Sequence, residues 1–444
     1  MKIRINSSNT HIYCGLLTIM MIVFGTLSPM LSLCAFLFSV ISVFYLNDND
    51  IICFMFLLLP FANIFKIDPA RSSLFTYLIL FLVLVKFLKI KQYGNIVLIS
   101  IALLLFTLII QIANSTFSLT GTIKFVSYIL LLTYCIACFD IINEYKKLFL
   151  SYTMGILIAS TIAYFGASLF DFKSYLIEKS LGYSYGFGYI SRFSGLDSDP
   201  NYYSINLIVA MALMVILYLK KDFSLIKTIT YFALIIPFIV LTFSKSALLM
   251  MFYPILLFVY SNIKKKKIAP FFVAIPIVLT VVFVVLSKEF LAKQIVMARF
   301  AGDKLSDING LTTGRLVNWE NYVNYMIERP YRLLFGSGIG APWVNGHAAH
   351  NIYLEALYHI GLIGSYLLLI SYKKILNIVN QKFNKNIFNY SIVICLIVMY
   401  FFLSELFYFD SPFQIILAFI VFQMNLTIGD EENEVFDNSS YFQS

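Results

Sequence analysis

The chain has 444 residues, of which 60% are hydrophobic and 12% charged, and its formal net charge is +9. Soluble domains carry about 25% charged residues. Here the apolar residues run from one end of the chain to the other, which excludes a soluble enzyme on a single anchor. The apolar runs suit membrane-crossing helices, which need about 20 residues, better than barrel strands, which need about 10. We therefore expect an all-α polytopic membrane protein.

Candidate membrane spans follow one another along the chain. The first four are short or closely spaced, so the sequence predicts about 12–14 transmembrane helices. The candidates are 12–28, 30–46, 51–65, 72–88, 96–113, 122–139, 148–167, 202–219, 226–243, 246–261, 268–287, 352–371, 387–404 and 411–427.

Lysine residues indicate how these spans are oriented. Lys and Arg mark the cytoplasmic ends of membrane helices, and alternating spans bring the lysine-rich short loops to one side together with both termini. The loops 168–201 and 288–351 then lie outside the cytoplasm. Because the charges set topology, we expect no nucleic-acid partner. The lysines concerned are Lys86, Lys89, Lys91, Lys146, Lys147, Lys220, Lys221, Lys227, those of 264–267, Lys373, Lys374, Lys382 and Lys385.

The larger outer loop is expected to carry short helices. Leu316, Trp319, Val323 and Met326 recur at helical spacing, which is typical of a helix at the membrane surface, and 289–300 is a weaker case. The chain is thus expected to divide into an amino-terminal transmembrane bundle (1–167), a transmembrane core with two outer loops (168–371), carboxy-terminal transmembrane helices (372–427) and an acidic cytoplasmic tail (428–444).

The smaller outer loop contains tyrosines interleaved with glycine. Tyr183, Tyr185 and Tyr189 can stack on sugar faces, or they can belong to an interfacial aromatic belt. The sequence leaves both interpretations open.

Charged residues close the same loop. Asp197 and Asp199 form a DxD, which in glycosyltransferases can hold a metal–nucleotide. Asp199 followed by Pro200 is also typical of a helix N-cap, which is the interpretation we favour. Arg192 remains as a cation on the same outer face.

Two more cations stand at the outer ends of spans. Lys245 interrupts a long apolar run; a cation near a membrane core is costly and usually functional, although it can also mark a turn between two spans. Arg315 can hold a phosphate ester through its guanidinium, or it can snorkel to lipid phosphate.

Three of the four histidines of the chain lie within residues 347–359. His350 is expected to share a helix face with Leu354 and Leu357. It can act as a general base, since imidazole titrates near neutrality, or it can bond a backbone carbonyl at a helix start. His347 and His350 have no obvious third ligand beside them, which argues against a metal site.

Arg192, Lys245, Arg315 and His350 are expected on one side of the membrane. Three cations and one candidate base suit an anionic substrate that carries a reacting hydroxyl. The cations make a metal unnecessary, so we expect no metal and no other cofactor.

Several stretches in this order resemble the O-antigen ligase and polymerase family of bacterial envelope glycosyltransferases. The resemblance implies a GT-C-like, multi-span glycosyltransferase at the periplasmic face of the inner membrane. Its donor is then an oligosaccharide on undecaprenyl diphosphate, and its further partners are membrane lipids and a chain-length regulator protein. The stretches are RFSGLDSDPN, FSKSALLM, TGRLVNWENY, FGSGIGA and HNIYLEALYHIGLIG.

The resemblance also implies roles for single residues. Arg315 is implied to bind the lipid diphosphate and His350 to deprotonate the acceptor hydroxyl, with inversion of the anomeric centre. Lys245 stands where the family usually has Arg, so it keeps a point charge but not a guanidinium fork. Arg192 matches the basic position of the first loop. Asn201, His347 and Asn351 are expected to support the site.

Three functions compete. A polymerase that joins lipid-linked repeat units into O-antigen or capsule is favoured by the many apparent spans and by Lys245. A ligase that moves finished chains onto lipid A–core would use the same donor chemistry. A flippase for the same lipid is less consistent with charges gathered in outer loops, because transporters place ionisable residues near the bilayer midplane.

Overall fold

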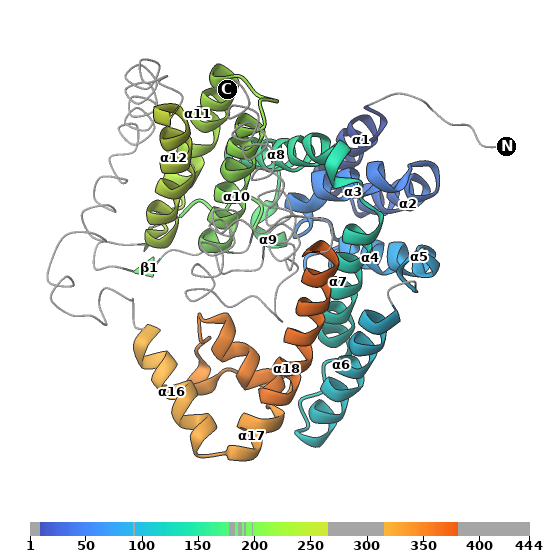
Figure 1. The fold of residues 1–444 in the computed structure, drawn as a ribbon, viewed down its shortest axis with the longest axis vertical. Helices are drawn as coiled ribbons and strands as arrows, with labels where there is room; N and C mark the ends of the chain where they lie inside the picture. Colours follow the sequence, from blue (N-terminus) through green and yellow to red (C-terminus); the bar gives the residue numbers. More distant parts are fainter. Residues whose placement is uncertain are drawn as a thin grey trace, which may run out of the picture. The chain divides into compact units, whose positions relative to one another are not determined.

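The computed structural model describes residues 9–91, 94–176, 183–184, 189–190, 192–197, 199–264 and 315–380. These residues are almost entirely helical, which confirms the all-α prediction (Figure 1). A small exception is a hairpin in which β1 (Tyr183–Ser184) pairs antiparallel with β2 (Tyr189–Ile190). Each predicted span inside the described ranges coincides with a helix. The spans 268–287, 387–404 and 411–427, and the weaker helix 289–300, lie outside them.

Four described helical segments are long and apolar enough to cross a membrane, by length and composition: Gly94–Ala113, Asn143–Phe165, Pro200–Leu219 and Ile352–Lys374. Shorter apolar helices accompany them. The chain is therefore an all-α polytopic membrane protein, and the count of about 12–14 spans stays a prediction.

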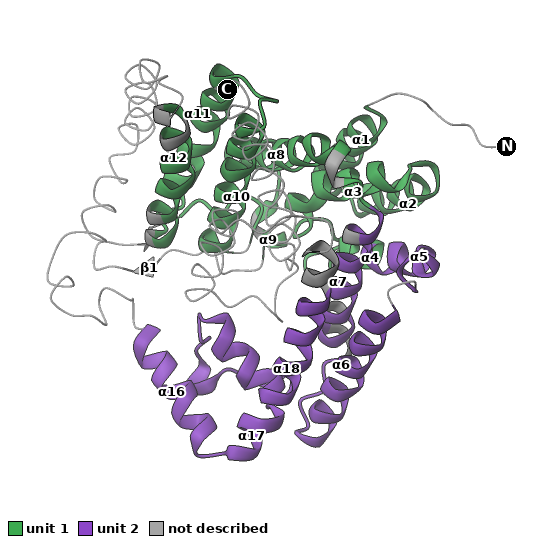
Figure 2. Ribbon diagram, in the orientation of Figure 1, with its two compact units in different colours: residues 1–78, 139–301 green, residues 79–138, 302–444 purple. Residues whose placement is uncertain are grey.

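The chain divides into two compact units, each built from two separate stretches (Figure 2). Unit 1 comprises 1–78 and 139–301, and unit 2 comprises 79–138 and 302–444. These units do not coincide with the predicted domains, and the predicted domain boundaries at 167 and 371 stay predictions.

Unit 1 is a helical bundle. α1 packs against α2 and α3, α3 against α8, and α8 against α10, which in turn packs against α11 and α12. Its elements are α1 (Thr10–Gly25), α2 (Pro29–Tyr45), α3 (Asp48–Leu58), η1 (Leu59–Phe61), the start of α4 (Leu74–Val85), α8 (Ile141–Phe165), α9 (Phe172–Tyr175), α10 (Pro200–Leu219), α11 (Leu225–Leu241) and α12 (Lys245–Lys264).

Unit 2 is built around α6 and α18. α6 packs against α7 and α18, while α16 and α17 pack against each other and against the start of α18. Its elements are α5 (Phe87–Lys91), α6 (Gly94–Ala113), α7 (Leu119–Cys138), α16 (Arg315–Ile327), α17 (Pro330–Phe335), η3 (Val344–Gly346) and α18 (Ile352–Asn380).

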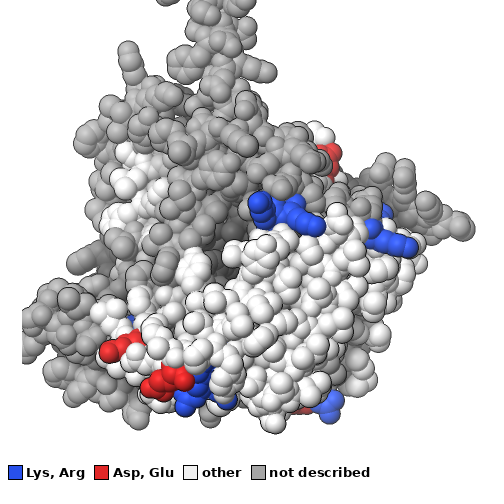
Figure 3. Space-filling model, turned by 60° about the horizontal axis from the view of Figure 1, so that its bottom comes forward, with Lys and Arg blue, Asp and Glu red and all other residues white. Residues whose placement is uncertain are grey.

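One face of α6 is apolar and exposed. Its residues recur every three or four positions, so they form a stripe along the helix. Figure 3 shows a broad uncharged area of described surface with charged groups at its margins. Since soluble monomers rarely expose large apolar patches, this stripe suits contact with lipid. The exposed residues are Leu98, Ile101, Leu105, Ile109 and Ile112.

A buried ionic cluster joins three helices of unit 1. Asp50 of α3 lies 3.4 Å from His11 Nδ1 and pairs with the Lys147 ammonium. His11 Nε2 lies 3.1 Å from the Ser151 hydroxyl. Buried charges are kept only where partners surround them, and this cluster ties α1 and α3 to α8.

Candidate functional site

In unit 1, Arg192 is buried, with 7% of its surface exposed. Its Nε donates to the carbonyl of Thr242 at 2.8 Å, and Nη2 donates to Asn201 Oδ1 at 2.9 Å. The backbone bond from Phe193 N to Leu241 O, at 3.1 Å, lies beside them. Arg192 therefore ties the first outer loop to the turn after α11, with Asn201 as its partner. Its predicted diphosphate-binding role stays a prediction.

The turn that contains Lys245 is as tight as the sequence predicts. α11 ends at Leu241 and α12 begins at Lys245, with Phe243 in the left-handed region at φ 48°. Ser244 Oγ caps the new helix by accepting from Ala247 N at 3.4 Å. The Lys245 side chain is outside what the structure describes, so its role stays a prediction.

The two carboxylates of the DxD have different surroundings. Asp199 Oδ1 accepts from Asn201 N at 2.6 Å and Pro200 is the first helical residue, which confirms the N-cap. Asp197 is 5% exposed and accepts from Asn63 Nδ2 at 3.2 Å. The described part of the chain contains no group of three or more His, Cys, Asp or Glu arranged to hold a metal ion.

The tyrosines proposed for sugar stacking fall on the small hairpin. Tyr183 lies in β1 and Tyr189 in β2, whereas Tyr185 is outside the described residues. Only the backbone of the two strands is described, so both interpretations of these rings stay open.

Lys66 is a buried cation that the sequence reasoning did not identify. It lies between η1 and α4, and its Nζ donates to the carbonyl of Tyr175 at 3.0 Å. Burial lowers the pKa of this ammonium. No local pattern could have signalled it, because its partner is 109 residues away.

In unit 2, the predicted helix 316–327 is present as α16, with Arg315 as its first residue. Its contact with the membrane surface stays a prediction. Tyr322 and Met326 are buried, whereas Val323 is exposed. Tyr322, which the predicted spacing did not include, is buried with partners for its hydroxyl. Pro330 is the first residue of α17 and so separates the two helices.

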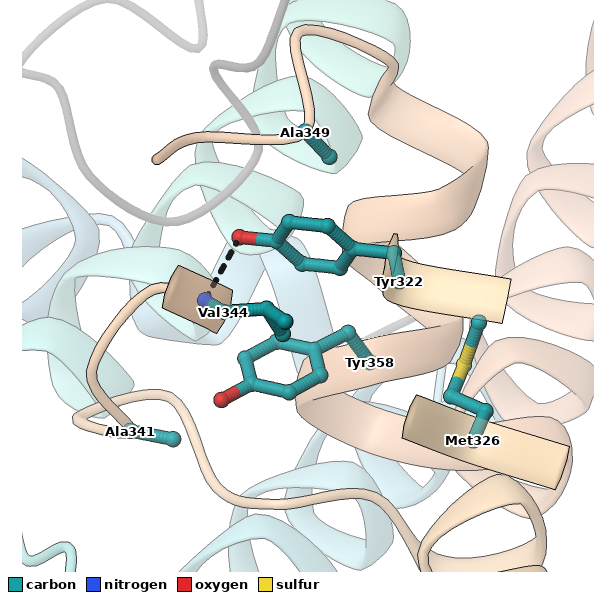
Figure 4. Packing of buried hydrophobic residues seen from close by; sticks show 6 residues of the cluster. All are labelled: Tyr322, Met326, Ala341, Val344, Ala349 and Tyr358. Carbon is teal, nitrogen blue, oxygen red and sulfur yellow. Dashed lines mark hydrogen bonds between the residues drawn. The ribbon is translucent and has the colours of Figure 1, made fainter. Parts of the chain in front are cut away.

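Residues 341–351 form a loop that α16 and α18 hold by its backbone. Tyr322 is 1% exposed. Its hydroxyl donates to His347 O at 3.0 Å and accepts from Val344 N at 3.4 Å (Figure 4). Trp319 Nε1 donates to Ala349 O at 2.8 Å. Burial raises the pKa of the Tyr322 hydroxyl, so it keeps its proton as a donor.

An apolar cluster surrounds these hydrogen bonds. Tyr358 of α18 contacts the Tyr322 ring edge-on, with ring centres 5.1 Å apart, and its hydroxyl donates to Pro342 O at 2.5 Å. The loop is therefore fixed at both ends by aromatic side chains. The buried members are Tyr322, Met326, Ala341, Val344, Ala349 and Tyr358 (Figure 4).

The expectation that His350 shares a helix face with Leu354 and Leu357 is wrong. α18 begins at Ile352, and Asn351 caps it by accepting from Tyr353 N at 3.0 Å and Leu354 N at 3.1 Å. His350 precedes the cap in the left-handed region, at φ 48°. Its side chain is half-buried and that of His347 is exposed. Asn351 thus supports the site by starting the helix directly after His350.

His359 belongs to a different arrangement. It is 1% exposed, and its Nδ1 lies 2.7 Å from Gly338 O. α18 is kinked at Gly361, which has φ 63°. The glycine-rich stretch 336–340 supplies donors to carbonyls near this kink. Ser337 N donates to Tyr358 O, and Gly338 N donates to His359 O. A Cβ on Gly338 would lie 2.2 Å from Thr116 Oγ1. The glycine-rich stretch thus forms turns that hold α18 at its kink.

The geometry of unit 2 brings Arg315 and His350 toward the same end of α16. Arg315 is one turn, about 6 Å along the helix axis, from Trp319. The Trp319 indole bonds Ala349, the residue directly before His350. A guanidinium can stabilise a departing anion, and an imidazole can take a proton from a nucleophile.

Comparison with known proteins supports a family for this region. Residues 230–369 match the family model described as O-antigen ligase. The match includes Lys245, Arg315, His347, His350 and Asn351, whereas Arg192, Asn201 and the hairpin tyrosines lie before it. No curated protein and no solved structure matches the chain.

Proposed function

We propose that this chain, which carries a domain of the O-antigen ligase and polymerase family at residues 230–369, polymerises lipid-linked repeat units into O-antigen or capsular polysaccharide. The family implies a glycosyltransferase-like membrane enzyme of O-antigen assembly. The observation that carries the proposal is the placement of Arg315 on α16 one turn from the residue that bonds the backbone next to His350.

The proposed donor is an oligosaccharide on undecaprenyl diphosphate. When the bond to the anomeric carbon breaks, the lipid diphosphate leaves with negative charge. Arg315 stabilises that charge with two parallel N–H donors. His350 removes the proton from the attacking hydroxyl. Attack opposite the diphosphate inverts the anomeric centre. Lys245 stays predicted as a further cation for the diphosphate, whereas the donors of Arg192 to Thr242 and Asn201 support a structural role for that residue.

The ligase alternative shares the donor and the two residues, and differs in the acceptor. A strain without the polymerase should make core carrying one repeat unit and lose the long-chain ladder, or lose high-mass polymer for a capsule. Gel analysis of lipopolysaccharide from the deletion strain tests this. Bare core together with long chains on undecaprenyl diphosphate would establish a ligase instead.

The proposal also places the chemistry at the periplasmic face of the inner membrane, with both termini cytoplasmic. Single-cysteine labelling in a cysteine-free background tests the orientation. Position 315 should react with an impermeant maleimide in intact spheroplasts, and position 266 only after permeabilisation. The reverse result would overturn the proposed site.

A further inference from the structure

We infer that Trp319 and Tyr322 are positioning residues, which hold His350 in register with Arg315 through two hydrogen bonds to the backbone of residues 347–349. This inference rests on the proposed function and adds to it the groups that place the base. Neither residue is assigned to touch donor or acceptor.

The helix geometry provides the first argument. Arg315, Trp319 and Tyr322 are spaced at i, i+4 and i+7, so all three lie on one face of α16. That face is the one turned toward the loop, because Trp319 and Tyr322 both bond it. The cation and the two loop-holding groups therefore move as one rigid element.

The loop backbone provides the second argument. From Gly338 to His347 the loop has short-range bonds of its own, such as Gly346 N to Trp343 O at 3.1 Å and His347 N to Val344 O at 3.1 Å. Beyond them, the bonds to the carbonyls of His347 and Ala349 come from α16, and α18 then begins with the Asn351 cap. His350 lies between these two anchors.

The conformation of His350 provides the third argument. A non-glycine residue at φ 48° is in a sparsely populated region, which persists only where the surroundings fix it. Bonds on the preceding residue and a cap on the following one supply that restraint. Apolar packing alone would not require the Trp319 N–H and the Tyr322 O–H to bond carbonyls only two residues apart, those of Ala349 and His347.

The test uses the full-length protein in detergent and lipid-linked repeat units extracted from the deletion strain. Tyr322→Phe keeps the ring and removes the hydroxyl, and Trp319→Phe keeps a smaller aromatic ring and removes the indole N–H. Each is expected to lower kcat about 10- to 100-fold, because a small misplacement of a reacting group costs that much, and to leave KM within about 3-fold. Tyr325→Phe removes a hydroxyl on the same helix, whose ring also contacts Tyr358, and is the matched control.

A double-mutant cycle separates positioning from mere folding. Because the two residues act through His350, adding Tyr322→Phe to His350→Ala should cause no further loss of kcat. If Tyr322→Phe lowers kcat in His350→Ala as much as it does in the wild type, the inference is wrong. Wild-type kcat in both single variants would also overturn it. If Trp319→Phe fails to accumulate in membranes, Tyr322→Phe decides the question alone.

Failure of this inference is distinguishable from failure of the proposed function. Full transfer by His350→Ala and Arg315→Lys would refute the proposed site itself. Inactive His350→Ala and Arg315→Lys beside fully active Trp319→Phe and Tyr322→Phe would refute only the positioning role.

Discussion

The outer loop of unit 1 and the loop before α18 in unit 2 are held in opposite ways. In unit 1 a buried side chain does the holding, since Arg192 uses its own N–H groups to bond Thr242 and Asn201. In unit 2 the backbone is held by Trp319 and Tyr322, and the side chains of Arg315 and His350 are half-buried.

This difference separates two uses of charged residues near a membrane. A cation whose donors end on its own protein contributes to the fold, and removing it leaves buried acceptors without partners. A residue whose backbone is fixed by others, with its side chain partly accessible, suits chemistry on a substrate. The contacts of Arg192 therefore favour a structural role for its guanidinium, and Arg315 and His350 stay the proposed reacting groups.

The largest effect is expected at His350. His350→Ala should reduce transfer by about 10²–10⁴-fold, the usual contribution of a general base, and leave the protein in the membrane at its normal level. Transfer by purified protein and immunoblots of membranes measure the two quantities.

The exposed His347 in the same loop provides a control for His350. His347→Ala removes a side chain from the same loop and should lose less transfer than His350→Ala. The opposite ranking would move the base to His347 and would contradict the assignment of His350.

Arg315→Lys should have the next largest effect. Lysine keeps the charge but cannot present two parallel donors to a diphosphate. Losing one charge-assisted hydrogen bond, about 1.5–3 kcal/mol, corresponds to about 10- to 150-fold in kcat/KM. Arg329→Lys, a change in a half-buried arginine that lies over the Tyr325 ring, is the matched control. Equal activity of the two variants would remove the guanidinium from the mechanism.

Features carried by local sequence were predictable. Span positions follow from runs of apolar residues, and the described helices match them. The Asp199 cap and the turn before Lys245 were equally accessible, since each depends on residues within three or four positions. The order of motifs between 190 and 370 also identified the family that residues 230–369 match.

Contacts between distant residues were not predictable. The Trp319 and Tyr322 bonds join residues 30 and 25 positions apart, and Arg192 meets Thr242 across 50. Nothing in the spacing marks which backbone carbonyl a buried donor will find. The burial of Tyr322 on α16 was not predictable for the same reason, because its partners lie outside the helix.

Arg192→Met tests whether this residue contributes to the fold through its bonds to Thr242 and Asn201. Each buried acceptor that loses its donor costs about 1–3 kcal/mol, so the thermal midpoint of purified protein should fall while transfer per folded molecule stays within about 3-fold of wild type. Arg71→Met removes an exposed arginine paired with Asp68 at 2.9 Å in the same unit, and should change stability by at most about 1 kcal/mol. Lost transfer at unchanged stability would support the diphosphate role that the sequence predicts for Arg192.

The smallest effect is expected at Asp199. Its carboxylate caps α10, so Asp199→Ala should cost about 1 kcal/mol of stability and retain transfer. Asp171→Ala removes the cap of the short helix α9 and is the matched control, because it loses the same kind of bond, from Ser174 N at 3.4 Å.

Thermal midpoints and transfer assays of both variants, with and without EDTA, distinguish a cap from a metal ligand. Inactivity confined to Asp199→Ala, with EDTA abolishing wild-type transfer and a divalent ion restoring it, would assign a metal to Asp197 and Asp199. The outer loop of unit 1 would then take part in the chemistry as well as in the fold.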